Sequence, residues 1–519
     1  MSQVLRTKTI EQSIRDTDEP GHRLRKRLGA LDLTVFGVGV IIGTGIFVLT
    51  GEAAGVKAGP AVSLSFVAAG IACALAALCY AEFASTVPVA GSAYTFSYAS
   101  LGELIAWIIG WDLILELALG ASTVAVGWST YFADVMKSAG VTVPGWMYGE
   151  GHNLLAAAIV LILTAVICLG IKLSSRVNMT MVVIKLSVVL LVIFAGLFYL
   201  KTSNWSPFIP PSGSKAAGGG ESAPSLLQDL GIGAGTFGVG GIFSAAALVF
   251  FAFIGFDIVA TAAEETVDPQ RDLPRGILGS LAICTILYVA VSLVVTGMVK
   301  YTQIKVDAPL AEAFRSVGQP TIANIVSVGA LFGLTTVMMI LLLGQSRVFF
   351  AMSRDRLLPP VFSHVSERFG TPVRTSLTTG VAVAVISTFV PLTSLAELVN
   401  IGTLFAFILV AIGVIVLRRT RADLPRAFRC PGVPVVPVLS VLASLYLMLN
   451  LPAATWLRFL IWMAVGFVVY FLYAARRSRL VTDPNYAREQ TAPRERFARV
   501  PSTSTGTETR SAMEDRSRS

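Results

Sequence analysis

The stretch Phe36-Gly37-Val38-Gly39-Val40-Ile41-Ile42-Gly43-Thr44-Gly45-Ile46-Phe47 lies inside an apolar run long enough to enter a bilayer. It nevertheless contains four glycines, and a glycine costs a helix interior about 1 kcal/mol relative to alanine. In hydrocarbon, a backbone that leaves the helix must be buried in protein or line a cavity. A glycine-broken membrane helix is therefore a candidate binding element whose bare N–H and C=O groups serve as ligands.

The same glycines have a second interpretation as a helix-packing face. Gly39 and Gly43 have the Gly-x-x-x-Gly spacing that lets two membrane helices approach closely. From this stretch alone, both interpretations stay open.

The composition decides the class of protein. Hydrophobic residues make up 54% of the 519 residues and charged residues only 14%, with a mean hydropathy of +0.73. Soluble domains average about 25% charged residues, so the chain is predicted to be an all-α polytopic membrane protein. The net charge of +9 does not indicate nucleic acid, because Lys and Arg cluster between apolar spans and in the tail. Five cysteines without a C-x-x-C pair and three scattered histidines predict no metal site, cofactor or enzyme centre.

We interpret twelve apolar segments as membrane spans, since a span needs about 20 apolar residues. Their bounds lie near 32–53, 61–84, 101–134, 153–171, 177–200, 242–265, 276–299, 321–350, 375–391, 395–417, 434–451 and 453–475. The predicted organisation is a cytoplasmic segment 1–30, a transmembrane domain 31–475 and a disordered tail 476–519.

The loop charges predict the orientation. With the N-terminus inside, 31 of the 40 Lys and Arg residues lie in inner segments and 7 in outer loops. Cytoplasmic loops carry the excess of Lys and Arg, so both termini are predicted to be cytoplasmic.

The sixth span repeats the features of the first. It reads Val249-Phe250-Phe251-Ala252-Phe253-Ile254-Gly255-Phe256-Asp257, with an aromatic cluster, one glycine and then an acid. The two interrupted spans lie five spans apart, so they run in opposite directions, as inverted repeats require. Matching interrupted spans in two halves are the best sequence pointer to a transporter binding site.

These breaks predict a clamp for a zwitterion. The exposed N–H groups around Ile41, Thr44 and Gly45 would bind a carboxylate, helped by the dipole of a half-helix. Exposed carbonyls at Phe251, Ala252 and Ile254 would accept hydrogen bonds from an ammonium group. Phe253 is a candidate lid or wall, and plain apolar packing is its alternative role.

Lys185 in the fifth span is the single residue that says most about the mechanism. It lies nine residues beyond Arg176, a depth of about 13 Å at roughly 1.5 Å per residue. A buried ammonium costs at least about 2.5–3.5 kcal/mol. A lysine that alternates between charged and neutral forms is predicted to couple transport to protons. The alternative is a permanent structural cation paired with backbone carbonyls.

Two further spans contribute candidate residues. Asp112 and Glu116 share one face of the third span, and Glu116 is the deeper candidate for binding a substrate amine or tuning Lys185. In the eighth span, Met338 is a predicted side-chain neighbour of the substrate.

Several longer motifs, in order along the chain, resemble the amino acid–polyamine–organocation transporters, and most closely the bacterial members of the cationic amino acid transporter branch. The resemblance covers nearly all spans. The motifs are IIGTGIF at 41–47, AGPA at 58–61, CYAEF at 79–83, PVAGSAY at 88–94, GWDLILE at 110–116, FFAFIGFD at 250–257, DLPRG at 272–276, AMSRD at 351–355 and FRCP at 428–431.

The resemblance implies a LeuT-like fold, in which two inverted repeats of five spans, at about 31–200 and 242–418, precede two extra helices at about 434–475. It implies the same carboxylate, amine and Glu116 contacts, and it places Lys185 where sodium-coupled relatives bind an ion. Leu117 departs from the family pattern, because relatives often have an aromatic residue there.

The predicted function is proton-coupled uptake of amino acids across the cell membrane by alternating access. Substrate, proton and bilayer are the expected partners, and the sequence leaves a small single-span or lipid partner open. Small to medium neutral amino acids such as alanine are expected to bind better than Arg or Lys, since an unpaired charge in a low-dielectric pocket costs several kcal/mol. The alternatives are an amino acid or polyamine exchanger without net proton coupling and a nutrient sensor that does not transport.

Overall fold

The computed structural model describes residues 28–482 apart from 87–91, 150, 171–174, 215, 218–222, 233–235, 261, 263–264, 365, 367–370, 423–425 and 427. Most of the predicted cytoplasmic segment and of the predicted disordered tail lies outside the described residues. The main helices are α2 (Ala30–Ile41), α3 (Thr50–Glu52), α4 (Val62–Thr86), α5 (Ser92–Ser100), α6 (Glu103–Ser138), α7 (Leu154–Cys168), α8 (Ser175–Gly196), α9 (Leu226–Asp229), α10 (Gly238–Val249), α11 (Phe256–Ala260), α12 (Pro269–Met298), α13 (Pro309–Ser316), α14 (Pro320–Arg354), α15 (Val373–Phe389), α16 (Leu392–Thr420), α17 (Val435–Leu449), α18 (Ala453–Val469), α19 (Ala475–Arg477) and α20 (Arg479–Thr482).

The helical content confirms the all-α prediction. Within the described residues, β pairing is limited to isolated bridges such as Leu28 with Thr266. In the part of the chain that the structure describes, eight helical segments are long and apolar enough to cross a membrane, and four shorter apolar helices accompany them. Together these segments cover all twelve predicted spans, as expected for a multi-pass membrane protein.

Prolines fix where many of these helices begin. Pro269, Pro309 and Pro320 occupy the first helical position of α12, α13 and α14. Proline is favoured there because its missing N–H would have no partner inside the helix and its φ is already helical. These starts define the outer and inner edges of the bundle.

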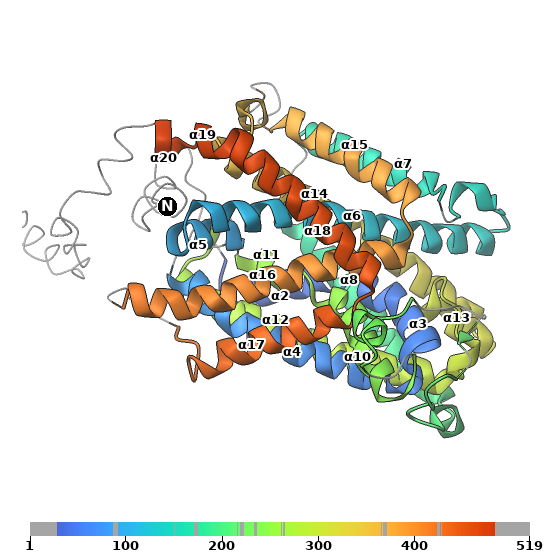
Figure 1. Cartoon of the computed structure of the whole chain (residues 1–519). Helices are drawn as coiled ribbons and strands as arrows, with labels where there is room; N and C mark the ends of the chain where they lie inside the picture. Colours follow the sequence, from blue (N-terminus) through green and yellow to red (C-terminus); the bar gives the residue numbers. More distant parts are fainter. Residues whose placement is uncertain are drawn as a thin grey trace, which may run out of the picture.

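The long helices lie side by side with their ends at two common faces (Figure 1). Helix α6 runs along α14 and α16, while α12 packs on α2 and α4, and α15 packs on α7. At one end of the bundle, on the left in Figure 1, lie α5, α19 and α20, and at the other end lie α3 and α13. The predicted inner loops map to the first end and the predicted outer loops to the second.

The first span is interrupted where the glycines predict it. Helix α2 ends at Ile41, and Ile42 adopts an extended backbone with ψ 101°. The chain turns helical again from Thr44 and continues as a π-helical turn over Gly45–Leu49. The predicted break is therefore confirmed.

The sixth span is interrupted as well. Helix α10 ends at Val249, a 3₁₀ turn follows over Phe250–Phe253, and Ile254 is extended with ψ 135°. Gly255 has a φ of +118°, a conformation that favours glycine, and α11 begins at Phe256.

Helices α5 and α13, between predicted spans, and the short helices α19 and α20, at the start of the predicted tail, were not predicted. Helix α5 lies in the segment assigned to an inner loop, and α13 lies between the seventh and eighth spans. The predicted irregular loop 203–241 contains only short helical turns in its described part, such as α9. Phe237 ties its end to the π-helical turn Ala53–Ala58, which follows the first span, by donating its N–H to the carbonyl of Lys57 at 2.7 Å.

Candidate functional site

The two breaks meet in the middle of the bundle. A Cβ atom placed on Gly45 would overlap the backbone of Ala252 in the 3₁₀ turn Phe250–Phe253, which we call the span-six turn. A Cβ on Gly255 would lie 2.7 Å from Cγ1 of Val40 in α2. The predicted carboxylate contacts and the predicted amine contacts therefore come from segments that touch.

The glycines of the first span also serve helix packing. A Cβ on Gly39 would meet Val182 of α8 at 2.6 Å, and one on Gly43 would meet Val337 of α14 at 3.4 Å. Both interpretations of the opening stretch therefore hold, because the same glycines break the helix and admit its neighbours.

Two of the three predicted carboxylate contacts, Thr44 and Gly45, lie at the start of the resumed helix, whereas the third, Ile41, is the last residue of α2. The first N–H groups of a helix have no partner within it, and in this helix those groups follow Gly43. Thr44 and Gly45 are buried. The hydroxyl oxygen of Thr44 is buried and has no hydrogen-bond partner among the described residues. A buried hydroxyl usually finds a partner, so Thr44 offers a free polar atom at the break.

Two of the three predicted amine contacts, Phe251 and Ala252, are carbonyls of the span-six turn, and the third, Ile254, is the extended residue that follows it. The carbonyl of Phe251 accepts a hydrogen bond from the N–H of Ile254 at 3.3 Å, and that of Ala252 lies 2.8 Å from the hydroxyl of Tyr288. Each carbonyl oxygen has two lone pairs. An ammonium group would therefore share these oxygens with partners already present.

Tyr288 of α12 links the two breaks, and the sequence reasoning missed it. Its hydroxyl lies 2.8 Å from the carbonyl oxygen of Ile41 and 2.8 Å from that of Ala252. One hydroxyl hydrogen can be donated to only one of these oxygens at a time. The only sequence signal is a lone tyrosine within an apolar span.

Lys185 reaches the first break from α8. The side chain is fully buried, and Nζ donates to the carbonyls of Gly39 and, at 3.3 Å, of Ile42. The last carbonyls of a helix lack partners within it and attract cations. Lys185 therefore caps the end of α2. This geometry is consistent both with the proton-coupling prediction and with the structural-cation alternative.

Glu116 and Lys185 have different ionisable neighbours. Glu116 is buried on α6, near Thr403 of α16, and its acidic neighbours are Asp257 and Asp112. The electrostatic neighbour of Lys185 is Cys284. This arrangement places Glu116 with the second half of span six and favours its predicted contact with a substrate over a role in tuning Lys185.

The remaining predicted residues are buried around the breaks. Phe253 stacks edge-on against Tyr288, with ring centres 5.3 Å apart, and also against Phe66, which is the geometry of its packing alternative. Phe251 is 6% exposed, whereas Phe253 is fully buried, so Phe251 is the better placed to face a ligand. Met338 is fully buried on α14 beside Val337, and its substrate contact stays a prediction.

The sequence model of a family described as "Amino acid permease" matches residues 28–483, which include both breaks and every residue of the predicted site. The chain belongs to the amino acid permease family. This result confirms the resemblance to the amino acid–polyamine–organocation transporters, and the chain is a transporter homologue rather than an enzyme.

Three relatives illustrate the range of the family. The branched-chain amino acid permease BcaP of Bacillus subtilis is 50% identical over 488 residues, which span 92% of this chain and 99% of the relative. The methylthioribose transporter of Bacillus subtilis is 46% identical over 487 residues, spanning 92% and 100%. The vacuolar cationic amino acid transporter 4 of Arabidopsis thaliana is 31% identical over 602 residues, spanning 92% and 97%.

A buried amide stabilises the second break of this permease. Nδ2 of Asn400 on α16 donates to the carbonyls of Ala247 at 2.7 Å and Leu248 at 3.0 Å. These carbonyls belong to the last turn of α10, which has lost its onward helical partners. Asn400 therefore satisfies backbone that the break leaves open.

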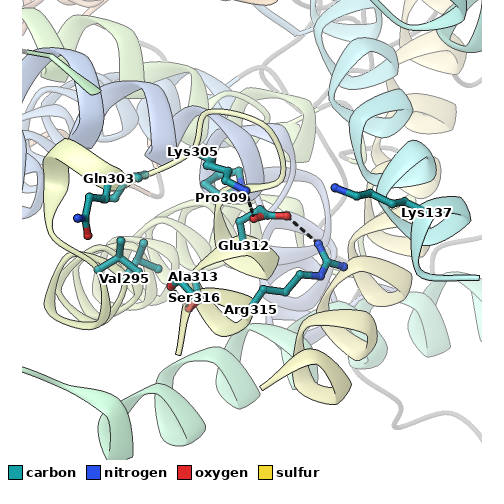
Figure 2. A pocket seen from close by; sticks show the side chains of 11 residues that line it. Lys137, Val295, Gln303, Lys305, Pro309, Glu312, Ala313, Arg315 and Ser316 are labelled. Atoms are coloured by element: carbon teal, nitrogen blue, oxygen red, sulfur yellow. Dashed lines mark hydrogen bonds and ion pairs between the residues drawn. The ribbon is translucent and has the colours of Figure 1, made fainter. Parts of the chain in front are cut away.

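A separate cavity of about 330 Å³ lies beside α13, at the end of the bundle predicted to be outside. Figure 2 shows the side chains that line it, and none of them belongs to the predicted substrate site. The lining residues are Lys137, Val295, Val299, Gln303, Ile304, Lys305, Pro309, Glu312, Ala313, Arg315 and Ser316.

An ion-pair cluster beside this cavity fastens α13. Arg315 binds both carboxylate oxygens of Asp134 on α6 and also Oε1 of Glu312 at 2.9 Å. Glu312 pairs with Lys305 at 2.7 Å. Burial opposes ionisation of Glu312, but hydrogen bonds from Lys305 and Arg315 outweigh it and lower the pKa of its carboxyl group. We call the Arg315–Asp134 contact the outer latch.

Proposed function

We propose that this permease takes up neutral amino acids together with protons by alternating access. The substrate carboxylate would bind the N–H groups of the resumed first-span helix and the Thr44 hydroxyl. The ammonium group would bind carbonyls of the span-six turn. The observation that carries this proposal is the contact between Gly45 and Ala252, which brings the two kinds of backbone ligand within reach of one small zwitterion.

Proton coupling is assigned to Lys185. Its ammonium group caps the end of α2 at the break, so loss of the proton would remove a cation from the segment that begins the substrate site. That change would alter how α2 packs on α8 and α14, where Gly39 and Gly43 meet their neighbours. A permanent structural cation, and an exchanger without net proton coupling, remain the alternatives for the test.

Neutral side chains are favoured over cationic ones. The described neighbours of the breaks are largely apolar, including Ile254, Val337 and Met338, and Glu116 lies with Asp257 beside α16. A cationic side chain would need an acid that it could reach, because an unpaired buried charge costs several kcal/mol. The relative at 50% identity is a branched-chain amino acid permease, so leucine, isoleucine and valine join alanine as proposed substrates.

The proposed setting is the cell membrane, with both termini cytoplasmic and the outer cavity on the opposite face. The proposed architecture is that of two inverted repeats, at about 31–200 and 242–418, with two added helices. The supporting observations are the excess of Lys and Arg in the predicted inner loops and the meeting of the first and sixth spans at their breaks.

Competition for uptake tests the substrate class. Purified permease in liposomes would take up labelled alanine in the presence of unlabelled alanine, leucine, arginine, lysine or methylthioribose. We expect alanine and leucine to compete at the lowest concentrations. If arginine or lysine competes at lower concentrations than alanine, the neutral-substrate proposal is wrong and Glu116 becomes the first residue to test as a side-chain partner. Stronger competition by methylthioribose would also overturn it.

A further inference from the structure

Two cysteine thiols meet near the predicted cytoplasmic ends of α4 and α16. Cys79 lies on α4, and Cys430 lies in the connector between α16 and α17. Both are free and buried, and the two thiols lie close enough to affect each other's ionisation. Thiols in contact are the starting arrangement that a disulfide requires.

Charged groups on both sides hold this pair in place. The N–H of Cys430 donates to Oε2 of Glu82 at 2.8 Å, and Glu82 follows Cys79 by three residues on α4. Arg418 of α16 donates to Oε2 of the same carboxylate at 2.7 Å and to the carbonyl of Cys430 at 2.9 Å. The backbone of Cys430 is therefore fixed against the turn of α4 that carries Cys79, independently of the thiols.

Cys430 is also the more reactive member of the pair. The neighbouring Cys79 thiol lowers the pKa of the Cys430 thiol below its usual value, against the opposing effect of burial. The thiolate is the form that reacts with oxidants. The adjacent Arg429 and Pro431 are exposed, so Cys430 lies one residue away from solvent.

We propose that Cys79 and Cys430 are a redox modification site, at which a hydroperoxide forms a reversible disulfide that joins α4 to the α16–α17 connector and slows transport. The Cys430 thiolate attacks hydrogen peroxide and, with one proton taken up, gives a sulfenic acid and one water. The Cys79 thiol then attacks that sulfur, so the S–S bond forms and a second water leaves. Two thiols are oxidised and one peroxide is reduced to two waters.

The consequence for transport rests on the proposed function. Helix α4 packs on α12 and α10, next to the broken spans, and also on α16 and α17, the two helices that the connector joins. Alternating access needs packed helices to shift at one end of the molecule. A covalent bond between α4 and the connector would hold that end closed.

Peptide mass spectrometry tests the disulfide without reference to transport. The full chain in liposomes is treated with hydrogen peroxide, its remaining thiols are blocked with N-ethylmaleimide, and the digest is examined for a cross-linked peptide. We expect a peptide joining Cys79 to Cys430 that disappears after dithiothreitol. Cys73→Ser, a buried cysteine on the same helix, should keep it, and Cys79→Ser and Cys430→Ser should lose it. Absence of this peptide from the oxidised wild type overturns the proposal.

Uptake of labelled alanine measures the effect on transport. Peroxide should lower wild-type uptake about tenfold or more, because a covalent link blocks the conformational step itself, and dithiothreitol should restore it. Cys79→Ser and Cys430→Ser should be insensitive to peroxide. Full uptake by protein that carries the disulfide overturns the regulatory role. If the reduced wild type takes up no substrate, the proposed function fails, and the cross-linked peptide still decides the modification.

Discussion

At the two breaks, three polar side chains form hydrogen bonds with backbone carbonyls rather than with other side chains. Lys185 caps carbonyls that α2 leaves open, Asn400 caps those of α10, and Tyr288 lies between carbonyls of both segments. A broken helix in a bilayer has no water to satisfy its backbone. These three polar side chains therefore make the breaks possible.

Lys185→Ala is predicted to abolish proton-driven accumulation while leaving a folded protein. The loss of the cap leaves the carbonyls of Gly39 and Ile42 short of a donor, at a cost of about 1–3 kcal/mol each, so the melting temperature should also fall. The measurement is alanine accumulation in liposomes across a range of pH. Lys300→Ala, at an exposed outer lysine, is the control. A variant that is destabilised but accumulates substrate with the wild-type pH dependence would make Lys185 a structural cation only.

Gly45→Leu is predicted to destroy substrate binding. Even a methyl group at this position would overlap the backbone of Ala252, so a larger side chain must push the two breaks apart. The measurement is the rise in melting temperature on adding alanine, which should vanish. Gly145→Ala, where an added methyl meets open space, should keep it. A wild-type thermal shift in Gly45→Leu would leave the first-span glycines with a packing role alone.

Tyr288→Phe is predicted to raise KM for alanine with a small effect on folding. The hydroxyl contributes one shared hydrogen bond to carbonyls of Ile41 and Ala252, and a typical bond contributes about 0.5–1.5 kcal/mol net. The ring still packs against Phe66 and Phe253. Uptake kinetics would be compared with those of Tyr148→Phe, in a predicted outer loop. An unchanged KM would show that Tyr288 does not position the backbone carbonyls of Ile41 and Ala252 for substrate binding.

At the scale of elements, the sequence predicts the features that depend on long apolar runs and on glycine, namely the spans and their breaks. The twelve spans and both breaks could be predicted, because hydrocarbon length and the cost of glycine in a helix act locally. Helices α5 and α13 could not, because they are short and owe their place to tertiary contacts such as the one between Arg315 and Asp134. Tyr288 and Asn400 could not be assigned for the same reason, since their partners lie in other spans.

The outer latch gives a prediction for α13. Asp134 is largely buried and Arg315 only about one-fifth exposed, whereas Lys305 is two-thirds exposed. An exposed ion pair contributes about 0–1 kcal/mol, and an unpaired group in a buried site costs about 1–3 kcal/mol. Asp134→Asn should therefore speed hydrogen exchange of the α13 amides, and Lys305→Ala should change it little. Equal exchange in both variants and the wild type would mean that the latch does not hold α13.

At the scale of the whole molecule, the bundle joins a substrate site and a buried cation through one segment. The carbonyls that Lys185 caps belong to Gly39 and Ile42, and the amides offered to substrate begin within a few residues, at Thr44. A proton lost from Lys185 and a substrate leaving the break would therefore act on the same stretch of backbone. This shared segment is the physical basis of the proposed symport.

Accumulation of labelled alanine in liposomes tests that claim most directly. The vesicles would contain purified permease and no internal amino acid, with the outside more acidic than the inside. The account predicts that alanine accumulates above its external concentration and that a protonophore releases it. Entry of label only into vesicles preloaded with amino acid, with no response to the proton gradient, would contradict the account and identify an exchanger.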